Sequence, residues 1–356
     1  MSQSLKQKTV KGVSWSFVDS ISSQGISFLV GLVLARLVTP AEYGLVGILL
    51  IFVSIFDCIV NCGFTSALIR KNDAKDIDYN TAFYTNLLIS IFLCFILFVS
   101  ASLIADFFSQ PQLVALTQVI SISVVIHALA LVQRTILTKR LDFKTQAKAN
   151  VISALLSGVI GISMAFFGYG VWSLVAQYML RAIFSTLLLW ILNQWWPKLQ
   201  FSWRSFKEMF SFSWKLLVSS LIDVAWRDIY QVVIGKCYSP ATLGQYARAH
   251  QFGSIFSSNL TTIIQRVSYP VLSSIQDDKE RMKEAYRRVI KVTMLITFIM
   301  MLGLAAISRP MIEVLIGRQW LIAAGFLPII VDNSEKNFVI AEDVSENSII
   351  INLQGN

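Results

Sequence analysis

The sequence predicts an all-α polytopic membrane protein, a helical bundle with about ten transmembrane helices. Of its 356 residues, 55% are hydrophobic and only 14% are charged, whereas soluble domains carry about 25% charged residues. Apolar runs of roughly twenty residues, enough to cross ~30 Å of hydrocarbon, recur along most of the chain. These runs lack the alternation of barrel strands, and unpaired backbone groups are too costly in lipid, so each run is predicted to be a helix.

Ten apolar segments are the expected spans. They lie at residues 13–37, 44–68, 81–105, 113–133, 149–167, 170–192, 209–234, 243–265, 289–307 and 311–330. The first is too long for a cleavable signal peptide and lacks a small-residue cleavage site, so it is expected to remain in the membrane.

The net charge of +9 follows from an uneven distribution of basic residues between the two sides of the membrane. With a cytoplasmic N-terminus, the cytoplasmic connections hold 21 of the 30 Lys and Arg residues: Lys6, Lys8, Lys11, Arg70, Lys71, Lys75, Arg134, Lys139, Arg140, Lys144, Lys148, Lys198, Arg204, Lys207, Arg266, Lys279, Arg281, Lys283, Arg287, Arg288 and Lys291. The opposite connections hold only Arg36, Lys236 and Arg309. This asymmetry predicts a cytoplasmic N-terminus and gives no indication of a nucleic-acid partner.

A short polar hairpin occurs twice, two hundred residues apart. Residues 35–44 read Ala-Arg-Leu-Val-Thr-Pro-Ala-Glu-Tyr-Gly, and residues 235–244 read Gly-Lys-Cys-Tyr-Ser-Pro-Ala-Thr-Leu-Gly. In each copy a hydroxyl residue, Thr39 or Ser239, is suited to cap the following helix, and the next proline fits its first turn. Six spans separate the copies, so both hairpins face the same side and the repeat is parallel.

The repeat predicts two lobes, the second of which is incomplete. Residues 1–208 form the expected N-terminal six-helix lobe, and residues 209–330 supply four helices of a partial C-terminal lobe. Residues 331–356 are no longer apolar enough for a membrane span and form an atypical polar tail. A truncated or frameshifted reading frame is expected, and a natural short variant is the alternative.

Two predicted spans carry small residues at every fourth position. These are Ser23, Ser27, Gly31 and Ala35 in the first span, and Ser153, Ser157, Gly161 and Ala165 in the fifth. Such faces let helix backbones approach closely in lipid, so tight packing is expected there.

The residues around the first hairpin resemble a known family. The stretches at residues 12–15 (Gly-Val-Ser-Trp), 33–44 (the first hairpin) and 315–320 (Leu-Ile-Gly-Arg-Gln-Trp) are similar to the polysaccharide-transport branch of the MOP superfamily. That branch includes Wzx-type O-antigen and capsule flippases, and the MATE drug exporters are its relatives.

The resemblance implies a MATE-like two-lobe helical bundle around a central cavity, in the bacterial inner membrane. It implies the transfer of undecaprenyl-diphosphate-linked oligosaccharides to the periplasmic leaflet for lipopolysaccharide O-antigen, capsule or exopolysaccharide biosynthesis. The implied partners are the lipid-linked oligosaccharide, membrane lipids and the polymerase and export machinery of the same pathway. No cofactor is implied.

Charged residues inside apolar spans are the candidate substrate-binding residues, because each costs ~2.5–3.5 kcal/mol at a helix centre. The segment at 209–234 concentrates them, with Lys215, Asp223, Arg227 and Asp228. Asp223 and Arg227 are spaced i,i+4 and can pair on one face. The set is expected to face a wet interior, although an ion pair that merely orients two helices is the alternative.

Further candidates lie in other spans. Arg248 and Arg181 are the next candidate ligands of a diphosphate. Arg181 and Lys215 lie near the ends of their spans, so the alternative is that each side chain extends to the membrane interface. Asp19 and Asp57 are candidates for coupling to a proton or sodium ion, but polar contacts between helices are favoured for them. His127 can titrate near neutral pH, and helix packing is again the favoured interpretation.

Missing motifs exclude several other functions. The sequence has no phosphate-binding loop, no metalloprotease helix, no dinucleotide fingerprint and no nucleophile elbow, so neither an enzyme nor an ATP-driven pump is expected. Its cysteines are not joined by a His or carboxylate cluster, so no metal is expected. The alternatives that stay open are a MATE-like small-molecule antiporter and an inactive truncated fragment of a flippase.

Overall fold

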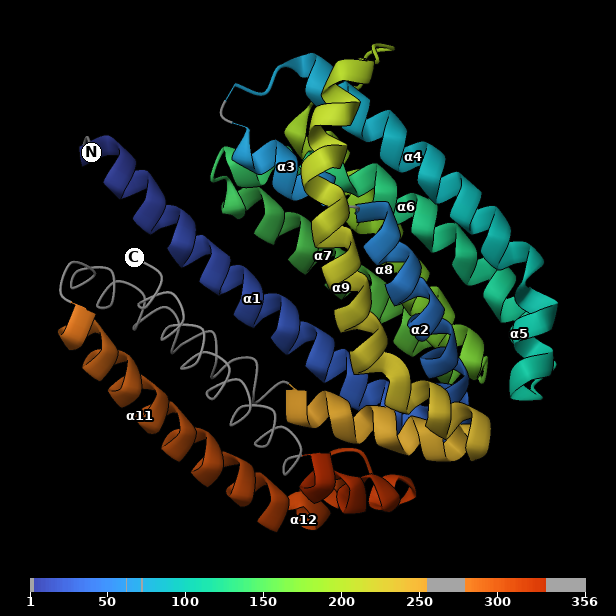
Figure 1. Cartoon of the computed structure of the whole chain (residues 1–356). Helices are drawn as coiled ribbons and strands as arrows, with labels where there is room; N and C mark the ends of the chain where they lie inside the picture. Colours follow the sequence, from blue (N-terminus) through green and yellow to red (C-terminus); the bar gives the residue numbers. More distant parts are fainter. Residues whose placement is uncertain (1–2, 62, 72, 255–278, 331–356) are drawn as a thin grey trace. The chain divides into compact units, whose positions relative to one another are not determined.

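The computed structural model describes residues 3–61, 63–71, 73–254 and 279–330 (Figure 1). Within these ranges all regular structure is helical and no strand occurs, which confirms the predicted all-α class. The chain divides into two compact units, Met1–Leu243 and Gly244–Asn356.

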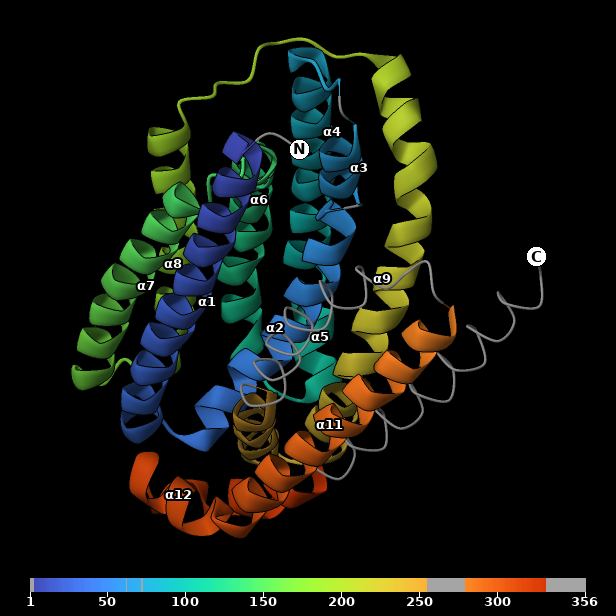
Figure 2. The same ribbon diagram turned by 90° about the vertical axis from the view of Figure 1, so that its left-hand side faces the viewer.

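Nine helices of the described ranges belong to the first unit. They are α1 (Gln3–Leu37), α2 (Pro40–Asn61), α3 (Phe64–Arg70), α4 (Asp76–Val99), α5 (Ala101–Phe108), α6 (Leu113–Lys139), α7 (Phe143–Phe166), α8 (Val171–Asn193) and α9 (Trp203–Cys237). Helix α7 packs between α1 and α8, while α6 packs against α2, α4 and α8, as two views show (Figures 1 and 2). Helix α9 packs along α2 and α3.

Six helices in the described ranges are long and apolar enough to cross a membrane, and they correspond to the first six predicted spans. A seventh is possible in the second unit, where α11 (Lys279–Ala306) and α12 (Ser308–Leu315) form a pair bent by 63°. The predicted segment 209–234 is helical within α9 but is not among the six. Since segment 243–265 runs beyond residue 254, the total of about ten spans stays a prediction.

The predicted lobe boundary differs from the boundary of the compact units. The repeat assigns α9 to the second lobe, whereas α9 lies within the compact unit Met1–Leu243. The two divisions rest on different properties, internal symmetry and packing, and the lobe boundary at residue 208 stays a prediction. The polar tail at 331–356 lies outside the described residues.

The exposed face of α4 is apolar. On α4, Leu88 and Phe95 are 68% and 65% exposed, whereas Asn86 and Ser90 on the same helix are buried. Soluble monomers rarely expose contiguous apolar surface of this kind. The distribution is that of a bundle surrounded by lipid.

The small-residue face of α7 lies where two neighbouring helices approach it closely. Ser153, Ser157 and Gly161 of α7 are all buried. A Cβ built on Gly158 would lie 2.5 Å from Cγ2 of Val30 on α1, and one built on Gly161 would lie 2.6 Å from Cβ of Gln177 on α8. The close packing predicted for this face is therefore confirmed.

The two repeated hairpins are capped as predicted. Thr39 Oγ1 accepts from the backbone N–H of Glu42 at 3.4 Å, and the Glu42 carboxylate accepts from the backbone N–H of Thr39 at 2.8 Å. In the second copy Ser239 Oγ accepts from the backbone N–H of Thr242 at 3.2 Å. The first hairpin thus forms a full capping box, and α2 begins at Pro40.

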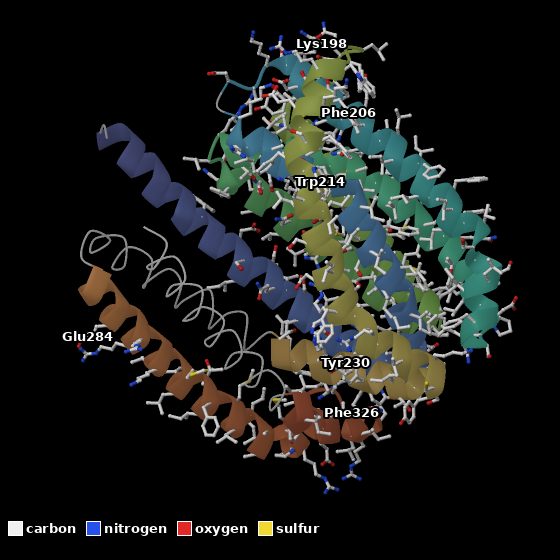
Figure 3. All side chains as sticks on the ribbon, in the orientation of Figure 1. Lys198, Phe206, Trp214, Tyr230, Glu284 and Phe326 are labelled. Atoms are coloured by element: carbon white, nitrogen blue, oxygen red, sulfur yellow. The ribbon has the colours of Figure 1, made fainter. Side chains whose placement is uncertain are left out.

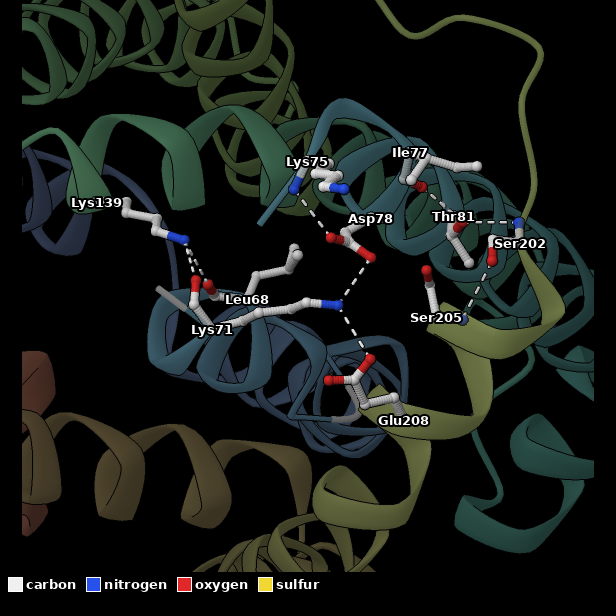
Figure 4. Close-up of polar contacts among 10 residues, drawn as sticks. All are labelled: Leu68, Lys71, Lys75, Ile77, Asp78, Thr81, Lys139, Ser202, Ser205 and Glu208. Atoms are coloured by element: carbon white, nitrogen blue, oxygen red, sulfur yellow. Dashed lines mark hydrogen bonds and ion pairs between the residues drawn. The ribbon is translucent and has the colours of Figure 1, made fainter. Parts of the chain in front are cut away.

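A lysine joins the ends of three helices (Figure 4). Lys71, which follows α3, donates to Asp78 of α4 at 3.1 Å and to Glu208 of α9 at 3.0 Å. Burial lowers the pKa of Lys71, but hydrogen bonds and charge from Glu208 and Asp78 outweigh it, so the pKa lies above its usual value. Lys139 of α6 donates to the backbone carbonyl oxygens of Leu68 and Lys71.

The connection between α8 and α9 is fixed at the same end of the unit. The backbone N–H of Lys198 donates to Asn80 Oδ1, and that of Ser202 donates to Thr81 Oγ1, both at 3.0 Å. Ser202 Oγ in turn accepts from the backbone N–H of Ser205 at 3.3 Å and caps α9 (Figure 4). The start of α9 is therefore anchored to α4, which determines how α9 runs along α2.

Candidate functional site

A polar cavity of about 640 Å³ lies within the first unit. Its walls come from α1, α2, α6, α7 and α8, five of the six apolar helices. Its charged and titratable lining residues are Asp19, Asp57, His127, Arg134, Tyr178 and Arg181. Most of the remaining lining residues are also polar: Ser20, Ser23, Gln24, Asn61, Asn150, Ser153, Gln177, Ser185 and Thr186. A hollow of this polarity inside an apolar bundle is a candidate binding site.

Two arginines reach this cavity and are held by hydroxyl groups. Arg181 Nη1 of α8 donates to Ser27 Oγ of α1 at 2.8 Å, and Arg134 Nη2 of α6 donates to Ser185 Oγ of α8 at 2.9 Å. Across the described residues, neither guanidinium has a carboxylate oxygen within 4 Å. Each guanidinium has five N–H donors, and one hydroxyl satisfies only one of them. The remaining donors are available to a ligand or to water in the cavity.

Two carboxylates also face the cavity. Asp19 of α1 accepts from Asn150 Nδ2 of α7 at 3.1 Å. Asp57 Oδ2 of α2 lies 2.7 Å from His127 Nδ1 of α6. The other oxygen of Asp57, Oδ1, is buried and has no hydrogen-bond partner. The cavity therefore holds both signs of charge, with the carboxylates bound to neutral or titratable partners rather than to the arginines.

Four residues that the sequence singles out line this cavity, namely Arg181, Asp19, Asp57 and His127. The sequence predicts diphosphate binding for Arg181 and ion coupling for the two aspartates, and these roles stay predictions.

The charged residues of α9 lie elsewhere, and none of them is among the residues that line the cavity. Lys215, Asp223 and Arg227 are exposed on α9, as are the labelled Trp214 and Tyr230 (Figure 3). Their predicted role in substrate binding stays a prediction, and the ion pair that the structure gives Arg227 is with Asp228, at 3.5 Å.

Asp228 joins α9 to α2. Its side chain is only 10% exposed, and Oδ2 accepts from Ser54 Oγ of α2 at 2.6 Å. This buried hydrogen bond is a different contact from the ion pair of Asp223 with Arg227 that the sequence leaves open as the structural alternative. Asp228 nevertheless stays a predicted binding residue.

Arg248 belongs to the second unit. Its guanidinium lies 5.8 Å from the ring centroid of Trp320, a cation–π distance, and it donates to Gln251. Its predicted contribution to substrate binding stays a prediction.

Arg134 is the cavity residue that the sequence interpretation placed wrongly. The sequence assigns it to a cytoplasmic connection, whereas α6 continues to Lys139 and includes it. A helical signal for its position exists, because His127 and Arg134 are seven residues apart and therefore share a face. The same spacing links Tyr178 and Ser185 on α8, with Arg181 between them.

The fold and sequence both match characterised transporters. Structural similarity links the chain to the lipid II flippase MurJ in an inward closed conformation, with a TM-score of 0.63 and 18% identity over 88% of this chain and 71% of that one. An inward-facing multidrug resistance MATE transporter of the MOP superfamily matches with a TM-score of 0.61 and 16% identity, over 88% of this chain and 79% of that one. The chain therefore has the MATE-like fold that the resemblance implied.

Sequence similarity extends over nearly the whole chain. The succinoglycan biosynthesis transport protein ExoT of Rhizobium meliloti is 28% identical over 321 residues, which are 90% of this chain and 65% of ExoT. The chain thus spans slightly less than two thirds of the length of this relative. A family profile described as "Polysaccharide biosynthesis protein" (Polysacc_synt_3) matches residues 33–324. Because the profile matches most of this chain, the chain belongs to this polysaccharide biosynthesis family.

Proposed function

We propose that the protein is a flippase that moves undecaprenyl-diphosphate-linked oligosaccharide repeat units across the bacterial inner membrane. The product would enter O-antigen, capsule or exopolysaccharide assembly. The name of ExoT describes a transport protein of succinoglycan biosynthesis, and that of MurJ describes a lipid II flippase. Membership in the same family and fold supports a similar role for this chain, without bond-making chemistry of its own.

The observation that carries the proposal is the pair of arginines in the cavity. A lipid-linked diphosphate brings negative charge into the low-dielectric interior of a bundle, where it needs charge-assisted hydrogen bonds. Arg134 and Arg181 offer planar N–H groups that suit phosphate oxygens, and hydroxyls rather than carboxylates hold them. An anionic headgroup therefore does not have to break an ion pair in order to bind.

The alternative is a small-molecule antiporter similar to the MATE exporters. The two cavity carboxylates, Asp19 and Asp57, favour a cationic substrate. The arginines oppose it, because a cation would have to approach two fixed positive charges.

The test compares two ligands that share a lipid tail and differ in charge, together with a small cation. The purified chain is placed in lipid nanodiscs, and the binding of undecaprenyl diphosphate, undecaprenol and the cation ethidium is measured. We expect the diphosphate to bind at least about tenfold more tightly than the alcohol, since one charge-assisted hydrogen bond contributes about 1.5–3 kcal/mol. Equal affinity for the diphosphate and the alcohol would contradict the flippase, and selective ethidium binding would support the antiporter.

We further propose a cytoplasmic N-terminus and, as functional partners, the polymerase and export machinery of the same pathway. The orientation is supported by the basic residues at one end of the first unit, such as Lys71, Arg140 and Lys198. The opposite connections at 109–112 and 167–170 contain no Lys or Arg.

This orientation predicts the labelling of two single cysteines in a background without the four native ones. Tyr169→Cys is expected to react with a membrane-impermeant maleimide added to intact spheroplasts, and Leu199→Cys only after permeabilisation. Both positions are well exposed, at 58% and 93%, so burial does not limit either reaction. The reverse pattern would show that the N-terminus is on the outer side.

A further inference from the structure

A second pocket lies within the first unit, between α3 and α9, at the end where Lys71 joins three helices (Figure 4). Its volume is about 310 Å³, at the lower end of the range for ligand pockets. The α3 side contributes Arg70 and Lys71, and α9 contributes Glu208, Met209, Ser211 and Phe212. None of these residues lines the large cavity, so this α3–α9 pocket is a separate site.

Arg70 is the group in this pocket that is available to a ligand. Its guanidinium lies 4.6 Å from the ring centroid of Phe212, a cation–π distance that links α3 to α9. Arg70 is exposed, and no carboxylate oxygen of the described residues lies within 4 Å of its guanidinium. An aromatic ring offers no oxygen to the guanidinium N–H groups, so these donors remain open to phosphate oxygens, which suit their planar fork.

Positive charge exceeds negative charge around the pocket. Lys71 is held by two carboxylates, those of Asp78 at 3.1 Å and Glu208 at 3.0 Å. Lys139 contacts the backbone of Lys71, and Lys215 lies one turn of α9 beyond the pocket. Three of these cations have no carboxylate partner among the described residues: Arg70, Lys139 and Lys215. Four cations and two carboxylates leave a net charge of +2, which favours an anion.

An apolar surface continues from the pocket along α9. Its residues are exposed and recur at every fourth position, so they form one slanting stripe that begins at the labelled Trp214 (Figure 3): Trp214, Val218, Ile222 and Trp226. At ~1.5 Å per residue the stripe is ~18 Å long, slightly more than half of the ~30 Å hydrocarbon core. A lipid whose phosphate lies in the pocket therefore has apolar side chains of α9 beside its acyl chains.

We propose that the α3–α9 pocket binds the headgroup phosphate of an anionic phospholipid, with Arg70 as its main ligand and with the acyl chains along the stripe on α9. Basic pockets between helices at a membrane surface are typical sites for such headgroups. The ligand is a constituent of the membrane rather than the transported lipid, so the inference goes beyond the proposed function and does not depend on it. Because α3 and α9 both line the pocket, the bound lipid is expected to stabilise their packing.

The test compares anionic phosphatidylglycerol with zwitterionic phosphatidylcholine of the same acyl chains. The binding of each lipid to the detergent-solubilised chain is measured by native mass spectrometry. We expect phosphatidylglycerol to bind the wild type more tightly, and Arg70→Gln to weaken that binding about fivefold, since one basic residue beside an anionic lipid contributes ~1 kcal/mol. Arg204→Gln is the matched control, because it removes the same charge from an exposed arginine of α9 outside the pocket lining. Equal phosphatidylglycerol affinity in wild type and Arg70→Gln would overturn the inference, as would an equal loss in Arg204→Gln.

A second variant covers the case in which Arg70→Gln does not fold. Glu208→Gln removes a carboxylate from the pocket while Lys71 keeps its contact with Asp78, so it is expected to bind phosphatidylglycerol more tightly than the wild type does. Unchanged or weaker binding would contradict the site.

A competition experiment separates this site from the transport of a lipid-linked diphosphate. Phosphatidylglycerol bound to the wild type is expected to remain when undecaprenyl diphosphate is added, because the two ligands occupy separate sites. If the diphosphate displaces it, the pocket belongs to the path of the transported lipid, and the phospholipid inference fails while the proposed function stands. If the diphosphate binds no better than undecaprenol while the phosphatidylglycerol preference is intact, the proposed function fails alone.

Discussion

Replacing Gly44 by alanine is expected to leave little folded protein in the membrane. A Cβ at this position would lie 1.8 Å from the carbonyl oxygen of Pro240 and 2.5 Å from its carbonyl carbon. Both atoms belong to the backbone, so no side-chain rotation relieves the overlap, and α2 has to separate from the segment at 240. Overpacking typically costs about 1–3 kcal/mol, and a backbone clash falls at or above the upper end of that range.

The measurement is the thermal midpoint of the detergent-solubilised protein, with the yield of monodisperse material as a second readout. Gly25→Ala is the matched control, because Gly25 also lies in a helix and a Cβ there meets nothing within 4 Å. It is expected to melt at or slightly above the wild-type temperature, since alanine favours a helix over glycine by about 1 kcal/mol. A Gly44→Ala protein that melts like the wild type would show that the approach of the two backbones is not required.

This close contact gives the sequence repeat a physical meaning. Gly44 belongs to the first copy of the hairpin and Pro240 to the second, and the two copies meet at this point. Leu243 extends the contact, because a Cβ built on Gly47 of α2 would lie 3.8 Å from its side chain. The sequence alone predicted the repeat and the caps at Thr39 and Ser239, because both depend on local residue types.

The identity of the cavity wall was harder to predict. Which face of a helix turns inward depends on its neighbours, and hydropathy reports only that a span exists. Arg134 follows an apolar run and precedes several basic residues, a pattern that is typical of a connection, although α6 continues to Lys139. Its hydroxyl partner, Ser185, lies fifty-one residues away on α8, a separation that no local pattern reveals.

The charged stripe of α9 illustrates the opposite difficulty. The cost of charge in lipid predicts that Lys215, Asp223 and Arg227 face water. It does not predict whether that water fills the cavity or lies at another surface. Within the first unit these residues are exposed and lie outside the cavity, and α9 makes its buried polar contact through Asp228 and Ser54. The apolar pattern of the sequence correctly predicts that these residues lie on one helix. Their position outside the cavity lining depends on how α9 packs along α2, which the pattern does not reveal.

Removing both cavity arginines is expected to abolish the transfer of lipid-linked oligosaccharide. In Arg134→Gln/Arg181→Gln a polar amide remains at each position, although it is shorter than the guanidinium that contacts Ser185 or Ser27, and two positive charges are lost. A hydrogen bond to a charged group contributes about 1.5–3 kcal/mol, so each substitution is expected to weaken diphosphate binding about 10- to 100-fold. With Asp19 and Asp57 left behind, the cavity becomes net negative and repels the headgroup.

The assay is surface polysaccharide output in a strain that lacks its own flippase, with membrane abundance measured in parallel. Arg140→Gln is the control, because Arg140 caps the same helix α6 but lies outside the cavity lining; it is expected to support normal output. Arg134→Lys separates charge from geometry, since a lysine keeps the charge and loses the planar fork. Arg227→Gln tests the site predicted on α9. If Arg227→Gln abolished output while the double cavity variant supported it at normal abundance, the headgroup site would lie along α9, and the cavity of the first unit would have to serve another purpose.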